Sequence, residues 1–249
     1  MMNETPVSDV KPEAVGISSE RLERVSAWLN QQIASERLAG ASVAVGRKGH
    51  LVYHQAAGLA DQEGGQAFAE DTILRIFSMT KPITTVAAMM LYERGCFQLD
   101  HPVARYIPAF EQTQVWCGGA IDDVEPQATR MTVRQLMTHT SGVTYGFMHQ
   151  NVVDEAYRGR GLDQNKAMNL AEWVDALAEV PLIAQPGTQW NYSVSTDVLG
   201  RLVEIWSGQD LNTFFKQEIF EPLGMVDTGF AVASDQAHQL ASLYRPSNG

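Results

Sequence analysis

Apolar residues recur at helical spacing in some segments of the chain and favour β-structure in others. In residues 18–35 they repeat every three or four positions, at Leu22, Val25, Leu29 and Ile33. This pattern predicts an amphipathic helix that begins at Ser18 or Ser19 and ends before Gly40. The β-rich runs 41–45 and 51–55 flank a turn-like segment with a glycine and predict an antiparallel hairpin. A helix followed by a hairpin indicates a layered α/β region.

A second predicted helix spans residues 78–94, after a short extended segment, and stops at Gly95. Pro82 falls in its first turn, where a backbone N–H has no helical partner. Apolar residues cover most of the circumference of this helix. We therefore expect it to run through the core and not over the surface.

From about residue 96 to 230, loops rich in Pro and Gly separate further helical segments. Capping-box patterns begin at Thr132 and Asn169, segment 197–206 predicts a third helix, and Asp210 is expected to cap a fourth. We expect residues 1–95 to form the first part of an α/β region, including the helix at 78–94. Residues 96–230 are predicted to form an inserted, mostly helical region, and residues 231–249 to begin the return to the α/β region.

Composition narrows the possible functions of the chain. Its 249 residues are 45% hydrophobic, enough to bury a large core, and its formal net charge of −11 disfavours nucleic acid and anionic lipid surfaces as partners. The longest strongly apolar run, residues 86–91, is too short to cross a bilayer. With two cysteines and no export signal in the sequence, we expect a cytoplasmic protein with free thiols.

The segment Ser78-Met79-Thr80-Lys81 carries the first candidate chemistry. A Ser and a Lys three positions apart share one face of a helix, and the helix N-terminus stabilises a developing anion. A lysine can accept the serine proton if burial lowers its pKa, which we expect here. Ser8 and Lys11 have the same spacing but lie in a polar arm. The alternative is that Ser78 is an ordinary helix cap followed by a solvated lysine.

Tyr192 is the second candidate, in a turn that leads into the helix beginning near Ser195 or Asp197. A phenol close to an ammonium group loses its proton more easily, so Tyr192 can take the serine proton and return it to a leaving group. Taken alone, Tyr192 fits equally well as a packing residue at a domain boundary.

In these motifs and their order, the chain resembles serine hydrolases of the class C β-lactamase and penicillin-binding-protein superfamily, and is most similar to the family VIII carboxylesterases. The similar segments are residues 41–61, 75–84, 99–103, 136–142, 192–194 and 219–225. The resemblance implies a β-lactamase/transpeptidase-like fold, in which helices flank an antiparallel sheet and a helical region is inserted. It also implies Ser78 as the acyl-accepting nucleophile, Lys81 as its base partner, Tyr192 as the proton shuttle, and no metal or organic cofactor.

Two departures from the family pattern affect the expected substrate. Val194 replaces the Asn of the family's Tyr-x-Asn motif, an Asn that binds the substrate amide, so esters are favoured over lactams and peptides. The third family motif, on a C-terminal strand, is absent from this chain, so we expect a second fragment or chain to supply those strands. The resemblance further suggests that Tyr145 faces the acyl pocket and that His139 belongs to a turn that ends a helix.

The expected function is serine-dependent hydrolysis of a small-molecule carboxylic ester through an acyl-enzyme, without nucleic-acid or membrane partners. A β-lactamase, D-amino-acid peptidase or amidase of the same fold is the alternative enzyme. A catalytically silent scaffold or ligand-sensing member of the fold is the alternative outside enzymes.

Overall fold

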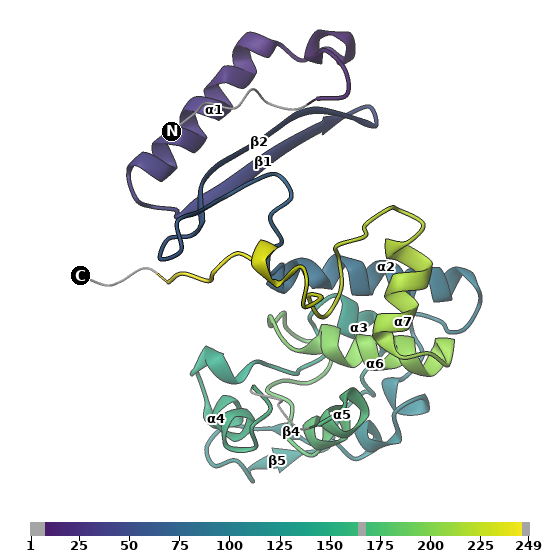
Figure 1. Ribbon diagram of the computed structural model, residues 1–249. Coiled ribbons are helices and arrows are strands. Elements are labelled where there is room, and N and C mark those ends of the chain that lie inside the picture. Colours follow the sequence, from purple (N-terminus) through teal and green to yellow (C-terminus); the bar gives the residue numbers. More distant parts are fainter. Residues whose placement is uncertain (1–7, 164–167, 246–249) are drawn as a thin grey trace. The chain divides into compact units, whose positions relative to one another are not determined.

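The computed structural model describes residues 8–163 and 168–245, and the chain divides into two compact units (Figure 1). The first unit contains residues 1–76 and 231–249, and the second contains residues 77–230. An antiparallel sheet in one unit and a mainly helical second unit are the two parts that the resemblance led us to expect.

The first unit is built on an antiparallel sheet in the order β1-β2-β3, formed by β1 (Gly40–Arg47), β2 (His50–Asp61) and β3 (Gln66–Ala67). Helix α1 (Ser19–Ala34) packs along β1 and β2 (Figure 1). The hydroxyl of Ser18 caps α1 by accepting a hydrogen bond from the Arg21 N–H. A short 3-10 helix (Pro12–Val15) precedes α1. The predicted helix and hairpin are therefore confirmed, and both strands extend beyond the predicted runs.

Residues 237–244 return to the first unit. A 3-10 helix (Ala237–Gln239) leads to Leu240, which forms a parallel bridge with Ile73. The guanidinium of Arg75 donates to the carbonyl of Ala241 at 2.8 Å, and the Tyr244 hydroxyl donates to Asp61 at 3.1 Å. These contacts attach the last described residues to Asp61, at the end of β2, and to the segment that contains Ile73 and Arg75.

The second unit is mainly helical. Its helices are α2 (Thr80–Glu93), α3 (Val133–Met137), α4 (Val152–Gly159), α5 (Leu170–Ala178), α6 (Ser195–Ser207) and α7 (Leu211–Phe215), which continues as a π-helix (Lys216–Phe220). The 3-10 helices are Phe77–Met79, Val103–Arg105, Pro108–Glu111 and Gly146–Met148, and the strands β4 (Val115–Trp116) and β5 (Val124–Glu125) pair antiparallel. Both predicted capping boxes are formed, at Thr132 and Asn169. Helix α4 was not predicted.

Helix α2 packs against α6 in the core of the second unit. Its buried residues, Thr84, Ala87, Ala88 and Leu91, follow the spacing of a single helix face. Ala87, Ala88 and Leu91 belong to the core cluster, so α2 contributes to the core as expected, although Val86 on another face is 51% exposed. The number of apolar residues on a helix does not reveal which of its faces other elements cover. In α2 the small side chains of Ala87 and Ala88 lie on the buried face. Through this packing α2 belongs to the second unit, whereas the prediction grouped it with residues 1–95.

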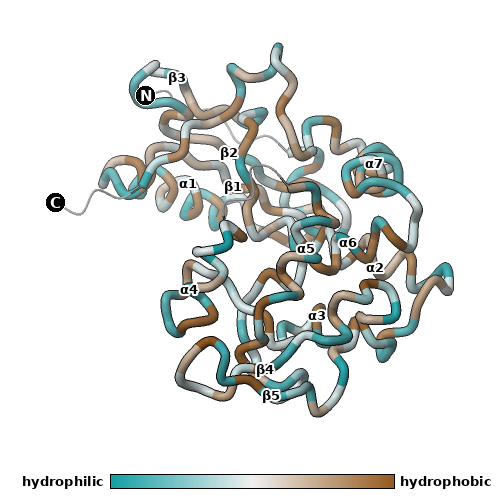
Figure 2. Tube along the Cα trace, turned by 90° about the horizontal axis from the view of Figure 1, so that it is seen from below, coloured by the Kyte–Doolittle hydropathy of each residue, from teal (hydrophilic) through white to brown (hydrophobic). Residues whose placement is uncertain are grey.

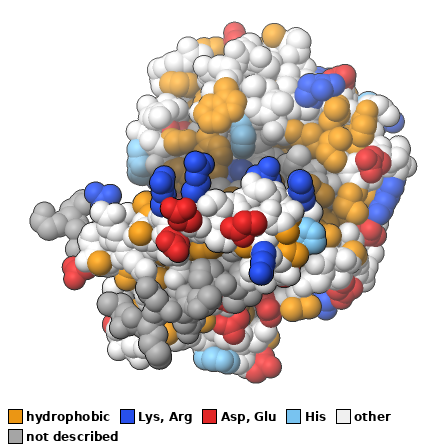
Figure 3. All heavy atoms as spheres, turned by 90° about the horizontal axis from the view of Figure 1, so that it is seen from above, with side chains coloured by type: hydrophobic (Ala, Val, Ile, Leu, Met, Phe, Trp, Pro, Cys, Tyr) orange, Lys and Arg blue, Asp and Glu red, His pale blue; other side chains and the backbone are white. Residues whose placement is uncertain are grey.

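Hydrophobic positions, brown in Figure 2, recur along the helices of the second unit, whereas Lys, Arg, Asp and Glu side chains share the surface drawn in Figure 3. The negative net charge is thus spread among charges of both signs. Within the described residues, no helix combines the length and apolar character that a membrane span requires.

Candidate active site

Ser78 lies in the 3-10 turn Phe77–Met79, which leads directly into α2. The preceding residue, Phe77, has a φ of 41°, an unusual backbone conformation for a residue with a side chain, and such strain is often found at functional sites. The Ser78 side chain is exposed, and Lys81, in the first turn of α2, donates from Nζ to its Oγ at 3.3 Å. The predicted Ser–Lys pair is thus formed at a helix N-terminus.

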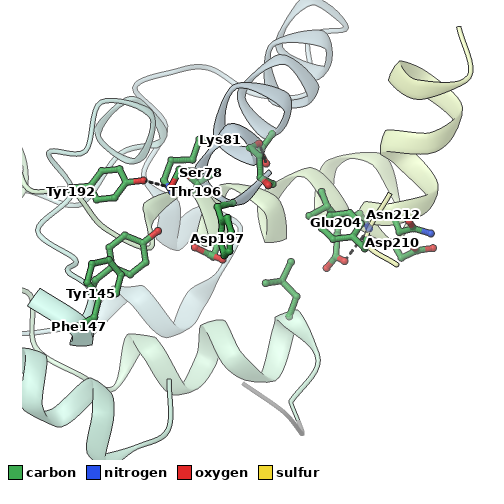
Figure 4. A pocket seen from close by; sticks show the side chains of 16 residues that line it. Ser78, Lys81, Tyr145, Phe147, Tyr192, Thr196, Asp197, Glu204, Asp210 and Asn212 are labelled. Carbon is green, nitrogen blue, oxygen red and sulfur yellow. Dashed lines mark hydrogen bonds between the residues drawn. The ribbon is translucent and has the colours of Figure 1, made fainter. Parts of the chain in front are cut away.

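Tyr192 completes a cluster with this pair (Figure 4). Its hydroxyl lies 2.6 Å from Ser78 Oγ, and either oxygen can be the donor. The Nζ of Lys81 lies 4.6 Å from the centroid of the Tyr192 ring. The fold therefore joins Ser78 and Tyr192, which are 114 positions apart in the chain.

The Tyr192 segment is held in place by the turn that follows α3. The N–H of Asn191 donates to the carbonyl of His139 at 2.8 Å, and its side-chain amide donates to the carbonyl of Val143 at 3.0 Å. Nδ1 of His139 lies 3.1 Å from the buried Ser193 hydroxyl. Through these bonds the His139 turn fixes the backbone on both sides of Tyr192.

The pKa values of Lys81 and Tyr192 shift in opposite directions. Burial lowers the pKa of Lys81, but the phenol oxygens of Tyr192 and Tyr145 raise it, and the net pKa lies above the usual 10.5. Hydrogen bonding to Lys81 and Ser78 lowers the pKa of Tyr192 below its usual 10.0, although burial opposes this shift. The expectation that burial gives Lys81 a lowered pKa is therefore wrong, because the electron-rich phenol oxygens favour its ammonium form.

Tyr145 lies beside the cluster, as the resemblance suggested. Its ring centroid is 5.4 Å from that of Tyr192 and 5.6 Å from Lys81 Nζ. Burial raises the pKa of Tyr145, with Lys81 acting in the opposite direction. The Phe147 ring stacks on Tyr145 with the centroids 4.6 Å apart.

Val194 does not line the pocket around these residues. Its side chain is 5% exposed and packs in the core cluster of the second unit. The prediction that Val194 is a substrate-binding residue, at the position of the family's Asn, is therefore wrong, since the start of α6 turns this side chain inward.

The cluster opens into a pocket of about 650 Å³. The lining residues include Ser78, Lys81, Tyr145 and Tyr192 together with Phe77, Thr80, Thr84, Phe147, Leu170, Thr196, Asp197, Glu204, Asp210, Leu211, Asn212 and Phe230. Sequence reasoning considered Asp197 and Asp210 only as helix caps and missed Phe147, Leu170 and Phe230. The available signal was the position of Asp197 shortly after Tyr192 at a helix start.

Potential metal ligands do not gather in this pocket or elsewhere in the described residues, where no three His, Cys, Asp or Glu side chains form a group able to hold an ion. The polar groups around Ser78 are hydroxyls, one ammonium and carboxylates. Their chemistry is that of proton transfer to and from a serine.

Comparison with known proteins shows which family and which proteins this chain resembles. Residues 25–249 match the family described as Beta-lactamase. Esterase EstB of Burkholderia gladioli is 36% identical over 232 residues, which are 92% of this chain and 57% of EstB. The structure of EstCE1, described as a hydrolase with promiscuous acyltransferase activity, has a TM-score of 0.78 at 30% identity and covers 89% of this chain and 56% of its own.

A third relative is the simvastatin synthase LovD of Aspergillus terreus, whose unliganded selenomethionyl structure has a TM-score of 0.75 at 26% identity. It covers 90% of this chain and 57% of its own. The chain thus spans somewhat more than half the length of each of these three relatives. By the match over residues 25–249 and the identity to EstB, the chain belongs to the beta-lactamase family.

Proposed function

We propose that the protein hydrolyses carboxylic esters through an acyl-enzyme on Ser78. The observation that carries this proposal is the 2.6 Å contact between Ser78 Oγ and the Tyr192 hydroxyl, with the Lys81 ammonium beside both. A serine hydroxyl becomes a nucleophile when a neighbouring group accepts its proton. In this cluster the phenol with the lowered pKa is the better acceptor, because Lys81 is held in its charged form.

In the first half of the reaction, ionised Tyr192 accepts the proton of Ser78 as Oγ forms a bond to the ester carbonyl carbon. The tetrahedral intermediate collapses, the bond to the alcohol oxygen breaks, and Tyr192 returns the proton to that oxygen. In the second half, water attacks the acyl-enzyme, Tyr192 accepts its proton, and Ser78 receives it as the acid leaves.

Lys81 stabilises the negatively charged groups of these reaction steps by its positive charge. The ammonium is within hydrogen-bonding distance of Ser78 Oγ and lowers the pKa of the Tyr192 phenol, so it favours both anionic partners. Backbone N–H groups of the turn that leads into α2, including that of Ser78, are proposed to hold the oxyanion.

The relatives support an ester substrate. EstB is named an esterase, and the description of EstCE1 is that of a hydrolase. We therefore propose a carboxylic ester as the class of substrate. The cytoplasmic location expected from the sequence stays a prediction.

The test is labelling with a fluorophosphonate followed by peptide mass mapping, together with turnover of a short p-nitrophenyl ester. We expect labelling on Ser78, and Ser78→Ala to abolish both labelling and turnover. The matched control is Ser8→Ala, which removes the serine of the other Ser-x-x-Lys segment and should change neither. Turnover that survives Ser78→Ala contradicts the proposal.

Acyl transfer to an alcohol is a second candidate function. Besides the description of EstCE1, the size of the pocket favours it, because about 650 Å³ accommodates an alcohol beside the acyl group. With butanol added, butyl ester should form at the expense of free acid in gas chromatography. Formation of acid alone would exclude this activity for butanol.

Comparing the turnover of nitrocefin with that of the p-nitrophenyl ester separates an esterase from a β-lactamase and from a catalytically silent scaffold. A β-lactamase of this fold would hydrolyse nitrocefin faster than the p-nitrophenyl ester, whereas an esterase shows the reverse order. A silent scaffold would hydrolyse neither compound and would leave Ser78 unlabelled.

A further inference from the structure

Asp197 is a pocket residue with no role in the proton path. It lies in the first turn of α6, lines the same pocket as Ser78 and is exposed. Figure 4 shows Asp197 near the Ser78 end, apart from the group formed by Glu204, Asp210 and Asn212. Desolvation raises the pKa of Asp197, and the nearby Lys81 ammonium opposes this shift by favouring the carboxylate. The Asp197 carboxylate in turn favours the neutral phenol of Tyr192 and so raises its pKa. Asp197 is therefore close to the reacting groups.

The other two acidic side chains of the pocket are engaged in the fold. Glu204 accepts hydrogen bonds from the N–H of Leu211 at 3.1 Å and from Arg201 at 3.0 Å. Asp210 caps α7 by accepting from the backbone N–H of Thr213 at 3.0 Å. Among the described residues, by contrast, none besides Asp197 itself donates a hydrogen bond to the Asp197 carboxylate. Its acceptor oxygens remain available to a molecule in the pocket.

The charges of the pocket also distinguish possible substrates. Lys81 is the sole cationic side chain among the described lining residues, and its ammonium already serves Ser78. A substrate carboxylate near Asp197 would face a like charge without a free cation to offset it. A hydroxyl or ammonium group there would find a carboxylate that accepts only from its own backbone N–H among the described residues and can accept further hydrogen bonds.

We propose that Asp197 is a specificity-determining residue, which accepts a hydrogen bond from a hydroxyl or ammonium group on the acyl part of the ester and rejects esters that carry a carboxylate there. This inference rests on the proposed ester hydrolysis and adds the substrate class that the site prefers. The shared chemistry is a hydrogen-bond donor, and the experiment below separates its neutral and charged forms.

The test compares four p-nitrophenyl esters with six-carbon acyl chains: hexanoate, 6-hydroxyhexanoate, 6-aminohexanoate and the adipate monoester. The kcat/KM of each is measured with the full chain at about pH 8, where carboxyl groups are normally ionised. In the wild type we expect adipate to be disfavoured relative to hexanoate by about tenfold, and the hydroxy ester, the amino ester or both to be favoured by about tenfold. Asp197→Asn should bring the adipate and amino-ester ratios to within about threefold of one, because the negative charge is lost, whereas a preference for the hydroxy ester should persist, because the amide oxygen still accepts a hydrogen bond.

Two further variants make the result specific. Asp197→Glu keeps the charge and should keep the discrimination against adipate. Asp175→Asn removes one negative charge from the exposed surface of α5 and should leave the ratios unchanged. Equal changes in Asp175→Asn and Asp197→Asn would assign the effect to overall charge and overturn the inference.

A wild-type chain that does not distinguish adipate from hexanoate also overturns it, whether or not Asp197→Asn folds. These outcomes differ from failure of the proposed function, which appears as ester turnover that survives Ser78→Ala. If the wild type and Asp197→Asn discriminate against adipate equally, the inference about Asp197 is overturned, while ester hydrolysis by Ser78 still stands.

Discussion

At the scale of single residues, the Lys81 ammonium and the Tyr192 phenol are proposed to have different roles at Ser78. The Lys81 ammonium has a raised pKa and the Tyr192 phenol a lowered one, and both groups contact Ser78 Oγ. A group that accepts a proton must be able to exist without one near neutral pH. The proposed mechanism therefore gives proton transfer to Tyr192 and electrostatic stabilisation to Lys81.

Tyr192→Phe removes the proton acceptor while keeping the ring. We expect kcat for a p-nitrophenyl ester to fall by about 10²-fold or more, because the lost interaction acts in proton transfer. Steady-state kinetics measures the change in kcat, and a thermal melting curve checks that the variant is folded. A variant with near-normal kcat would reduce Tyr192 to a packing residue.

The pH dependence follows from the two shifts. In the proposed mechanism deprotonated Tyr192 is the active form. The value of kcat/KM should therefore rise with pH through a pKa below 10.0, and loss of the Lys81 proton should reduce it again above pH 10.5. In Lys81→Met the rising limb should move to higher pH, because the ammonium that lowers the pKa of Tyr192 is gone. A rising limb that vanishes without moving would instead make Lys81 the base.

Val194→Asn tests the burial of that side chain. An amide in the core has no partner there, so the free energy of unfolding should fall by about 1–3 kcal/mol. Urea denaturation measures this loss, and nitrocefin turnover should not increase relative to ester turnover. A raised ratio in a variant of unchanged stability would restore Val194 to the substrate site.

At the scale of elements, the close contact between the turn after α3 and the segment before α6 positions Tyr192. Gly142 lies in that turn with a φ of 90°, and its carbonyl accepts from the N–H of Ile183 at 2.8 Å. A Cβ at this position would lie 2.3 Å from the carbonyl oxygen of Ala184. Only glycine fits both the backbone conformation and the space.

Gly142→Ala should therefore destabilise the protein and lower kcat through displacement of the Tyr192 segment. The matched control is Gly208→Ala at the end of α6, where φ is 71° but no atom lies within 4 Å of an added Cβ. We expect Gly142→Ala to cost at least about 1 kcal/mol more than the control in urea denaturation, because the control carries backbone strain without the steric clash. Equal costs would show that the close approach relaxes freely.

At the scale of the whole molecule, the negative net charge is expected to affect how charged substrates approach the pocket. The chain has a formal net charge of −11, and the described pocket residues include one cation and three carboxylates. A negative field attracts cations and repels anions, and dissolved salt screens it.

We expect kcat/KM for the cationic 6-aminohexanoate ester to fall as sodium chloride is raised from about 0.02 to 0.5 M, while that of neutral hexanoate changes little. The adipate monoester should show the opposite trend. Initial rates over this salt series measure the effect. Parallel trends for all three esters would show that the field of the molecule does not act on the substrate.

Local signals determined much of the fold in advance. The capping box at Thr132, the Ser18 cap and the hairpin of β1 and β2 were predictable because each depends on residues a few positions apart. Helix α4 was missed because it is short and its hydrophobic pattern carries few repeats. The Ser78–Lys81 pair was recognisable for the same local reason, since three positions on a helix place both on one face.

What the sequence by itself determined was therefore most of the local elements and, through motif order, the family and the three residues of the cluster. Only the tertiary structure decided how these residues affect one another. The raised pKa of Lys81, the burial of Val194 and the exposure of Asp197 in the pocket each depend on groups distant in the chain. Burial and electrostatic interactions act through space, so the spacing of residues along the sequence does not contain them.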